Sequence, residues 1–260
     1  MKKQFVYLIA CMLVPLFLVS CEKDKGKEGV PEENITRDAV MDADSNMYDV
    51  VKIGNQVWMT ENLRTTKYED GTPIPLDTVG VPSRYCPNGN AANVKKYGYL
   101  YNFRAVVNGA QGSETNPSGV QGICPQGWHV PSDAEWQELE SYVRDHLDPN
   151  NENHLPAKAL ASSEGWQTSS RVGTPGNDPS SNNFMGFFAL PAGKLQISID
   201  EDQFYSYVGF GLAAYFWTCS GSGSAATMRS IHNDSQDIFS DTSSDGISVR
   251  CLKDPETNLK

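Results

Sequence analysis

Cysteine and histidine give this chain its widest choice of chemistry, because thiolates and imidazoles can act as nucleophiles, bases and metal ligands. The sequence contains six cysteines: Cys11, Cys21, Cys86, Cys124, Cys219 and Cys251. No two of them are spaced as Cys-x-x-Cys, and the histidines are scattered: His129, His146, His154 and His232. Structural zinc sites usually draw their ligands from closely spaced pairs. The sequence therefore predicts no metal site.

Motifs for nucleophilic and phosphoryl-transfer chemistry are also absent from the sequence. The serine of Gly221-Ser222-Gly223 lacks the Gly-x-Ser-x-Gly pattern of a nucleophile elbow. Neither a P-loop nor a dinucleotide fingerprint occurs, and no spacing of acidic residues and histidines marks an acid–base pair. We expect His129 to be structural and hydrogen-bonded to a cap or loop carbonyl. The sequence favours a protein with no catalytic activity and no cofactor.

The best-specified local structure is a helix that begins after Ser132. Ser132 is a good N-cap, and Glu135, three residues later, completes a capping box. Asp133 and Glu135 place negative charge in the first turn, which the helix dipole favours. One face is apolar, because large hydrophobic residues recur at helical spacing: Trp136, Leu139, Val143 and Leu147. Pro149 marks the far limit of this helix.

The N-terminus reads as an export signal followed by a tether. Two lysines precede an apolar run over residues 5–19, which is too short for a comfortable membrane span. Leu18-Val-Ser-Cys21 resembles a lipobox, so we expect residues 1–20 to be removed and Cys21 to be acylated. Acyl chains there would hold the protein to a membrane. The alternatives are a plain secretory peptide and a transmembrane anchor. Residues 21–41, mostly polar, are expected to form a flexible tether.

The charge of the chain excludes some partners. The formal charge of -11 becomes -13 after processing, because two of the 21 basic residues leave and none of the 32 acidic ones. Such a balance disfavours nucleic acid and anionic lipid surfaces. Acidic residues just after Cys21 resemble export tags of outer-membrane lipoproteins, so we expect an outer-membrane protein exposed at the cell surface.

The rest of the chain predicts a mixed domain over residues 42–254, followed by a tail at 255–260. Residues 42–46 have the alternating oxygens of a calcium loop, but Met47 and Ile53 stand where Gly and Glu are needed, so a hairpin turn is favoured. Helical spacing recurs over 155–162, and a long polar loop follows at 163–183. Short strands are expected at the following places: ending near residue 40, 48–53, 57–59, within 97–107, 184–190, 194–199, 209–219, 225–233 and 246–252. Two helices among small antiparallel sheets give an α+β domain.

Four stretches also resemble a known family. Cys-Pro-Gln-Gly-Trp-His-Val-Pro-Ser-Asp-Ala-Glu-Trp at 124–136 resembles the signature of the Fibrobacter succinogenes major paralogous domain. Residues 51–63, 97–102 and 246–253 are similar to further blocks of that family, in the same order. The family is similar to the sulfatase-modifying-factor group and, through it, to C-type-lectin-like folds. The resemblance implies a C-type-lectin-like domain with a place at the cell surface, and it implies no particular activity.

The cysteines can be interpreted with and without this resemblance. Cys86, Cys124, Cys219 and Cys251 remain in an exported protein, so disulfides are plausible in any of three pairings, and free thiols are the alternative. The resemblance implies Cys124–Cys251, which leaves Cys86–Cys219 as a second pair. An oxidase in the sulfatase-modifying group uses two cysteines near the C-terminal end, where this chain has only Cys251. Oxidase chemistry is therefore not expected.

The predicted function is the binding of an extracellular glycan, protein or polymer by a surface lipoprotein. The Glu-Pro-Asn, Gln-Pro-Asp and Trp-Asn-Asp motifs of calcium-dependent lectins do not occur, so binding would depend on other groups. Candidate ligand-binding residues are aromatic side chains in or beside polar loops: Trp166, Phe204, Tyr205 and Tyr207. The alternatives are a divergent enzyme related to the modifying factor and a structural subunit of a surface assembly.

Overall fold

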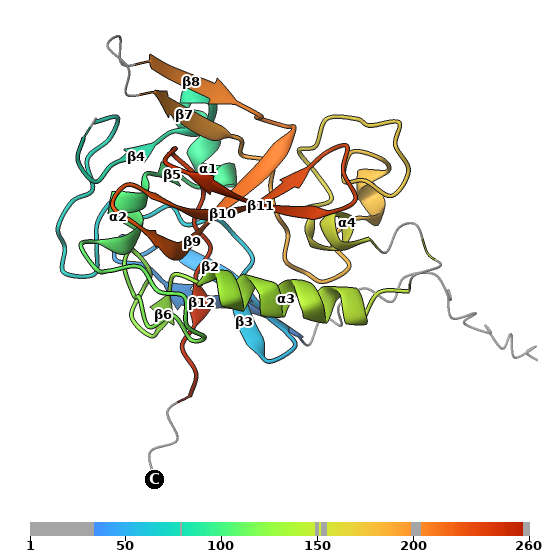
Figure 1. The fold of residues 1–260 in the computed structure, drawn as a ribbon, viewed down its shortest axis with the longest axis horizontal. Helices are drawn as coiled ribbons and strands as arrows, with labels where there is room; N and C mark the ends of the chain where they lie inside the picture. The colour runs from blue at the N-terminus through green and yellow to red at the C-terminus, as the bar shows by residue number, and fades with distance from the viewer. Residues whose placement is uncertain (1–33, 79, 149–150, 152–154, 199–203, 257–260) are drawn as a thin grey trace, which may run out of the picture.

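The computed structural model describes residues 34–78, 80–148, 151, 155–198 and 204–256. The predicted signal segment, the lipidation residue Cys21, most of the tether, Pro149 and residues 257–260 lie outside the described residues. Within the described part, short helices and small antiparallel sheets make a mixed α+β fold (Figure 1). In those same residues, no helix is long and apolar enough to cross a membrane.

The largest sheet brings together segments from both ends of the domain. Its strand order is β1-β2-β3-β12-β6, and every neighbouring pair is antiparallel. The strands are β1 (Ile35–Met41), β2 (Met47–Ile53), β3 (Gln56–Met59), β12 (Leu252–Lys253) and β6 (Trp128–His129). β12 lies between the N-terminal hairpins and the entry of the main helix, so the end of the domain closes this sheet.

Strand β1 confirms the strand expected to end near residue 40 and removes residues 35–41 from the expected tether. Residues 35–41 were assigned to the tether, but they pair with β2 from Ile35↔Val51 to Met41↔Met47. Only Val40 of β1 is buried, so this edge strand needs few apolar residues. Its sequence therefore resembles that of a solvent-exposed segment. The expected hairpin turn at 42–46 is confirmed, because the Asp42 carboxylate accepts the backbone N–H groups of residues 44 and 46, each at 2.9 Å.

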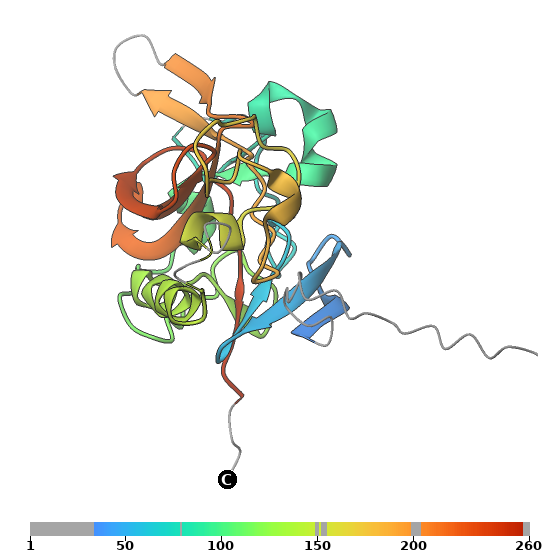
Figure 2. The same cartoon turned by 90° about the vertical axis from the view of Figure 1, so that its right-hand side faces the viewer.

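A second sheet has the order β11-β10-β9 and supports the main helix. Its strands are β9 (Ala213–Ser222), β10 (Ala225–His232) and β11 (Ile238–Ser243). The helix α3 (Asp133–Asp145) contacts β9 and β10. Figure 2 shows α3 nearly end-on, on the opposite side of the C-terminal chain from the β1–β2 hairpin. The strands within 209–219 and 225–233 were predicted, but β11 was not.

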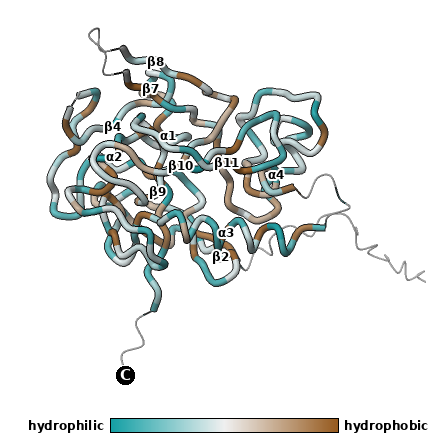
Figure 3. Tube along the Cα trace, viewed as in Figure 1, coloured by the Kyte–Doolittle hydropathy of each residue, from teal (hydrophilic) through white to brown (hydrophobic). Residues whose placement is uncertain are grey.

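The capping box of α3 is confirmed. Ser132 Oγ accepts the backbone N–H of Glu135 at 3.2 Å, and Glu135 Oε2 accepts the backbone N–H of Ser132 at 2.9 Å. Trp136, Leu139 and Val143 are all fully buried, as the helical spacing predicts. Hydrophobic and hydrophilic residues alternate along α3 (Figure 3), and the buried hydrophobic ones recur at helical spacing.

The remaining elements are short. They are β4 (Arg84–Tyr85), β5 (Leu100–Tyr101), β7 (Lys194–Ser198), β8 (Phe204–Val208), α1 (Val94–Tyr97), α2 (Phe103–Val107), α4 (Pro156–Leu160) and the 3-10 turns η2 (Pro87–Gly89), η3 (Ala91–Asn93) and η4 (Pro179–Ser181). α4 confirms the second predicted helix. Short strands were expected within residues 97–107; β5 confirms one of them, but the rest of the segment holds the end of α1 and the helix α2.

Residues 184–190 are largely buried but form no strand. Their backbone groups bind partners outside any strand ladder. The carbonyls of Phe187 and Phe188 accept hydrogen bonds from the guanidinium of Arg250, and Ala189 forms a single parallel bridge with Ala161. Residues 246–248 likewise make isolated bridges, and only Leu252 and Lys253 form a strand. The strand predicted over 184–190 was therefore wrong in type, although its burial was predicted correctly. The strand predicted over 246–252 is confirmed only at Leu252.

Candidate functional site: an open polar cleft

An open cleft of about 600 Å³ lies where the β1–β2 turn, the segment after β3 and the start of α1 meet. Both signs of charge, two uncharged polar groups, one aliphatic side chain and one aromatic side chain line it: Asp44, Asn46, Glu61, Arg64, Thr66, Val94, Lys95 and Tyr99. Binding sites for small polar ligands are concave and carry a few well-placed polar groups. The cleft is therefore the candidate binding site, and a ligand could bind only those polar groups that the protein leaves without partners.

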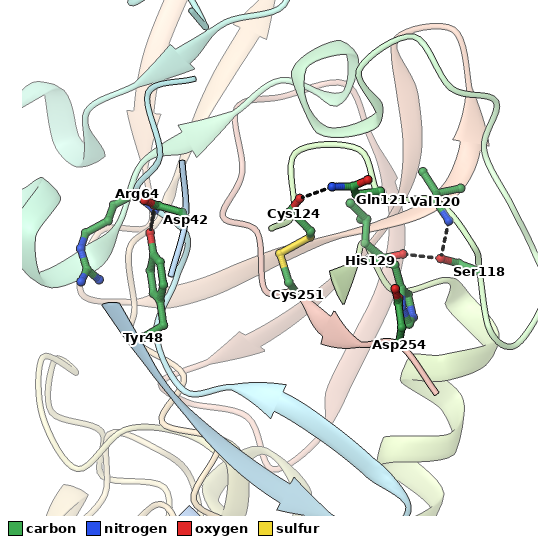
Figure 4. The surroundings of a disulfide bond; sticks show 11 residues. Asp42, Tyr48, Arg64, Ser118, Val120, Gln121, Cys124, His129, Cys251 and Asp254 are labelled. Atoms are coloured by element: carbon green, nitrogen blue, oxygen red, sulfur yellow. Dashed lines mark hydrogen bonds and ion pairs between the residues drawn. A yellow bond between two sulfur atoms is a disulfide. The ribbon is translucent and has the colours of Figure 1, made fainter. Parts of the chain in front are cut away.

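The turn between β1 and β2 fixes the orientation of Asn46. Its amide nitrogen donates to both carboxylate oxygens of Asp42, at 3.1 and 2.8 Å. Tyr48 donates its hydroxyl to the same carboxylate at 2.5 Å (Figure 4). Only the –NH₂ group of an amide can donate to a carboxylate, so Asn46 Nδ2 is identified by its partners. Its carbonyl oxygen remains as an acceptor on a half-buried side chain that lines the cleft.

Arg64 and Glu61 bind each other and the protein around them. Arg64 Nη1 lies 3.2 Å from Glu61 Oε1, and Nη2 donates to the carbonyl of Met47 at 2.7 Å. The guanidinium also lies over the Tyr48 ring, 4.4 Å from its centre. Glu61 Oε2 accepts the backbone N–H of Asp49 at 3.4 Å. Both charges at this wall are therefore already engaged.

Asp44 is engaged in the same way. It accepts the backbone N–H of Thr66 and the hydroxyl of Thr65, and Lys67 Nζ lies 3.4 Å from its carboxylate. Burial by itself would raise the pKa of Asp44, but the hydrogen bonds from Thr66 and Lys67, together with the Lys67 charge, outweigh it and lower the pKa. Asp44 is thus an ionised carboxylate that holds the loop after β3.

Lys95 and Tyr99 reach the cleft because α1 ends at a glycine. Gly98 has φ +73°, and a Cβ there would lie 2.7 Å from both Asn62 Cβ and the Leu63 carbonyl, so only glycine allows this close approach. Lys95 is exposed, and none of the described residues forms an ion pair or hydrogen bond with its ammonium. Its neighbour Lys96, by contrast, pairs with Glu164 at 2.9 Å.

Tyr99 is the aromatic wall of the cleft. It is half-buried, and the guanidinium of Arg84 lies 5.1 Å from its ring centre. The ring meets Tyr101 edge-on, with 6.3 Å between centroids. In the described part of the chain, no group is hydrogen-bonded to the Tyr99 hydroxyl. Tyr99 can therefore offer a ligand both an apolar ring surface and a hydroxyl.

The predicted aromatic site is not assembled. Trp166 is only 7 % exposed, packs in the same core cluster as Trp58 and Trp136, and donates Nε1 to Ser162 Oγ at 3.1 Å. Its expected role as an exposed ligand contact was wrong, because the loop that carries it folds back over the core. The structure does not bring Trp166 together with the β8 tyrosines, which border another cluster.

The other aromatic candidates lie on β8. Tyr205 is 37 % exposed, with its ring 6.4 Å from that of Tyr85, and Tyr207 is half-buried against Gly89. Phe204 begins the strand. These residues remain candidates for ligand contact, but the cleft was missed by sequence reasoning. Residues 42–46 were the nearest signal, since they were examined for calcium binding and interpreted as a turn.

One of the two expected disulfides is present. Cys124 and Cys251 are bonded, with 5.9 Å between their Cα atoms, and join the segment before β6 to the segment before β12 (Figure 4). Cys86 and Cys219 are buried free thiols, so the Cys86–Cys219 prediction was wrong. Cys219 Sγ contacts the Ser113 carbonyl at 3.6 Å, whereas Cys86 precedes η2 near Tyr207.

Burial makes both free thiols poor nucleophiles. It raises the pKa of Cys86, with a further contribution from the negative charge of Asp77. Burial also raises the pKa of Cys219 to about 11. A thiol reacts through its thiolate, so neither environment activates the group. Among the described residues, no cluster of three or more His, Cys, Asp or Glu side chains could hold a metal ion.

His129 is structural, but its partners differ from those expected. Its Nε2 lies 2.8 Å from Glu135 Oε1 and its Nδ1 lies 2.6 Å from Asp254 Oδ1, so two carboxylates replace the expected carbonyl. Burial lowers the pKa of His129, but hydrogen bonding and charge from both carboxylates outweigh burial and raise it. The imidazole thereby links the first turn of α3 to the chain after β12.

Comparison with known proteins places the chain in a family. The model of the Fibrobacter succinogenes major domain matches residues 51–253. The chain belongs to this family. The matched region begins within β2, so the family domain contains the part of the cleft from Glu61 to Tyr99 but not Asp44 and Asn46. No curated protein and no solved structure matches the chain.

Proposed function

We propose that this protein is a lipid-anchored, non-catalytic binding protein of the cell exterior, and that the cleft takes a polar extracellular ligand. One observation carries the proposal: most charges around the cleft are paired, while three of its lining residues keep a polar group without a partner among the described residues. These groups are the Lys95 ammonium, the Asn46 carbonyl oxygen and the Tyr99 hydroxyl. A glycan, a segment of a protein or another polymer could use these groups.

Binding is better supported than catalysis. A divergent enzyme of the sulfatase-modifying type would use a reactive thiol, and the pKa values of Cys86 and Cys219 are raised rather than lowered. The Cys124–Cys251 disulfide supports the C-type-lectin-like arrangement implied by the family resemblance. Lectin-like frameworks bind ligands through their surface loops. Here the β1–β2 turn and the start of α1 would provide the ligand contacts.

The lipid anchor at Cys21 is a separate part of the proposal. We expect cells grown with labelled palmitate to label the wild-type protein and to leave Cys21→Ser unlabelled. The wild-type protein should fractionate with the outer membrane and be accessible to protease added to intact cells. A labelled Cys21→Ser protein, or a wild-type protein released in soluble form, would contradict the anchor.

The cleft is tested by filling it. The purified full chain would be applied to an array of glycans and extracellular proteins, beside Lys95→Trp, which should block the cleft, and Lys96→Trp. Lys96 is the matched control, because it is the next exposed lysine of α1 and does not line the cleft. We expect selective binding by the wild type and Lys96→Trp, and loss of binding by Lys95→Trp. Equal binding by all three proteins would overturn this placement of the site.

A further inference from the structure

We infer that the cleft recognises an acidic saccharide, with its carboxylate on Lys95 and its hydroxyls on Asn46 and Tyr99. The inference rests on the proposed function and narrows its ligand to one chemical class. The polar groups of the cleft that have no partner among the described residues carry it.

The charges point to an anionic ligand. Glu61 and Arg64 pair with each other at 3.2 Å, and Asp44 is held by backbone and side-chain donors of the loop after β3. Lys95 is the one charged residue lining the cleft that has no ion-pair or hydrogen-bond partner among the described residues. A carboxylate or sulfate on the ligand would supply the missing counter-charge. Hydrogen bonds between charged groups are the stronger ones, so this contact would set the ligand class.

The uncharged groups point to a ligand rich in hydroxyls. Asn46 presents a carbonyl oxygen that can only accept, since its nitrogen donates to Asp42 at 2.8 and 3.1 Å. The Tyr99 hydroxyl can donate or accept, and its ring offers an apolar surface for the C–H face of a sugar. Saccharide hydroxyls both donate and accept, so adjacent hydroxyls can satisfy these two groups together.

A peptide fits this cleft less well. Protein partners are usually anchored by apolar or aromatic side chains in desolvated pockets. Of the residues that line the cleft, only Val94 is aliphatic and only Tyr99 is aromatic, and the cleft is open. A cleft this open does not desolvate such an anchor. An acidic peptide is therefore treated as an outcome of the test.

The test uses the full chain and titration calorimetry. The probes are oligosaccharides that carry uronic acid, sialic acid or sulfate, each beside its carboxyl-reduced or desulfated counterpart, and a set of acidic peptides. We expect at least one acidic oligosaccharide to bind and its neutral counterpart to bind about tenfold more weakly or worse, as loss of a charged hydrogen bond requires. Lys95→Gln should weaken binding of the acidic form about tenfold, and Lys96→Gln should leave it unchanged.

The outcomes separate this inference from the proposed function. Equal affinity for acidic and neutral forms, with Lys95→Gln unchanged but Lys95→Trp inactive, would overturn the acidic class and leave the cleft as the binding site. Binding of acidic peptides alone would overturn the saccharide. Binding that Lys95→Trp does not alter, or no binding of any probe or array member, would overturn both. Lys95 is exposed, so these variants should fold like the wild type, which their melting temperatures would check.

Discussion

Arg250 is a fully buried cation whose hydrogen bonds go to neutral oxygens. Its Nε donates to Asn62 Oδ1 at 2.9 Å, Nη1 to the carbonyls of Met59 and Phe187, and Nη2 to the carbonyl of Phe188 at 2.8 Å. Burial lowers the pKa of Arg250 to about 9. The guanidinium therefore ties β3, the 187–188 segment and the last part of the chain together by satisfying their backbone.

Arg250→Met should be strongly destabilising. It leaves three buried acceptors without their donor, namely the carbonyls of Met59 and Phe187 and the Asn62 side-chain oxygen. Each unsatisfied group costs about 1 to 3 kcal/mol, so a loss of at least about 3 kcal/mol is expected. Urea unfolding measures it. Arg144→Met is the control, because the Arg144 side chain is 49 % exposed and its pair with Glu140 should contribute about 1 kcal/mol or less. Similar small losses for both variants would contradict this role.

His129 predicts a pH dependence of stability. Its pKa is raised in the folded protein above the ordinary value of 6.5, so folding favours the protonated form. The stabilisation is fully present below about pH 6.5 and is lost as the pH rises through the folded pKa. The difference in unfolding free energy between wild type and His129→Gln should therefore shrink as the pH rises from about 6.

Asp254→Asn provides a second readout for His129. Loss of one carboxylate should move the folded pKa of His129 downward, so the decline should still begin near the unfolded pKa but end at lower pH and be smaller than in the wild type. Titration of the His129 ring protons by NMR would follow the same shift. A stability difference that grows with pH, or that is flat, would contradict the two-carboxylate environment.

At the scale of elements, α3 could be predicted from the sequence because its signals are local. Ser132, Glu135 and the apolar spacing lie within a few residues of one another, and each confirmed contact joins near neighbours. Residues 184–190 could not be assigned in the same way. Whether a buried apolar run becomes a strand depends on which partner takes its carbonyls, and here Arg250, more than 60 residues away, takes two of them.

Ser132→Ala should destabilise the protein by about 1 kcal/mol, because it removes the side-chain acceptor that caps α3. The matched control is Ser141→Ala, the same substitution at an exposed position in the middle of the same helix. It should be neutral or slightly stabilising, since alanine has the higher helix propensity. Thermal unfolding of both variants tests this, and equal melting temperatures would place the helix start elsewhere.

Lys158 fastens the long loop after α4. Its buried ammonium donates to the carbonyls of Thr174, Asn177 and Asp178 and to the Asn182 side chain, the last two at 2.9 Å. Burial lowers the pKa of Lys158. The ammonium lies among four oxygens from residues 174–182, and no local sequence motif indicates this arrangement. From the sequence, the loop was therefore expected only to be long and polar.

Lys158→Met should loosen that loop. The side chain keeps its length but loses the donors that hold four oxygens, so trypsin should cut after the exposed Arg171 faster than in the wild type. Time courses followed by mass spectrometry would measure the rate. Lys253→Met, at an exposed position on β12, should leave the cutting rate unchanged. An unchanged rate in Lys158→Met would show that the loop is held elsewhere.

At the scale of the molecule, the sheet joins the two ends of the domain, and a disulfide joins the middle of the domain to its C-terminal end. The Cys124–Cys251 disulfide spans 127 residues and lies beside the place where β12 enters between β3 and β6. Four cysteines left three pairings open, and only the family resemblance singled out this one. Whether Cys86 and Cys219 meet depends on the path of the whole chain, which the residues around them do not encode.

Replacing Cys124 and Cys251 together by alanine should lower the free energy of unfolding by about 4 to 5 kcal/mol, because a long loop is no longer closed in the unfolded chain. Denaturant unfolding would measure the loss. Cys86→Ala, which removes a thiol outside any bond, should cost about 1 kcal/mol or less. A thiol assay of the denatured, unreduced domain should find Cys86 and Cys219 free.

The cleft belongs to this largest scale, and the sequence alone could not reveal it. Its walls come from residues 44–46, 61–66 and 94–99, and no spacing within any one segment marks a site. The packing of Gly98 against Asn62 and Leu63 brings the last two segments together. The aromatic candidates were chosen because they lie in or beside polar loops of the sequence. The cleft is instead identified from polar groups that the fold leaves without hydrogen-bond partners.

The most direct test of the cleft is hydrogen–deuterium exchange of the full chain with and without a saturating ligand chosen from the binding assays. The account predicts slower exchange, on ligand addition, in peptides that cover residues 42–46, 61–66 and 94–99, with little change elsewhere. Protection confined to β8, with Tyr205 and Tyr207, or to residues 163–183 would contradict it and return the binding site to the aromatic loops.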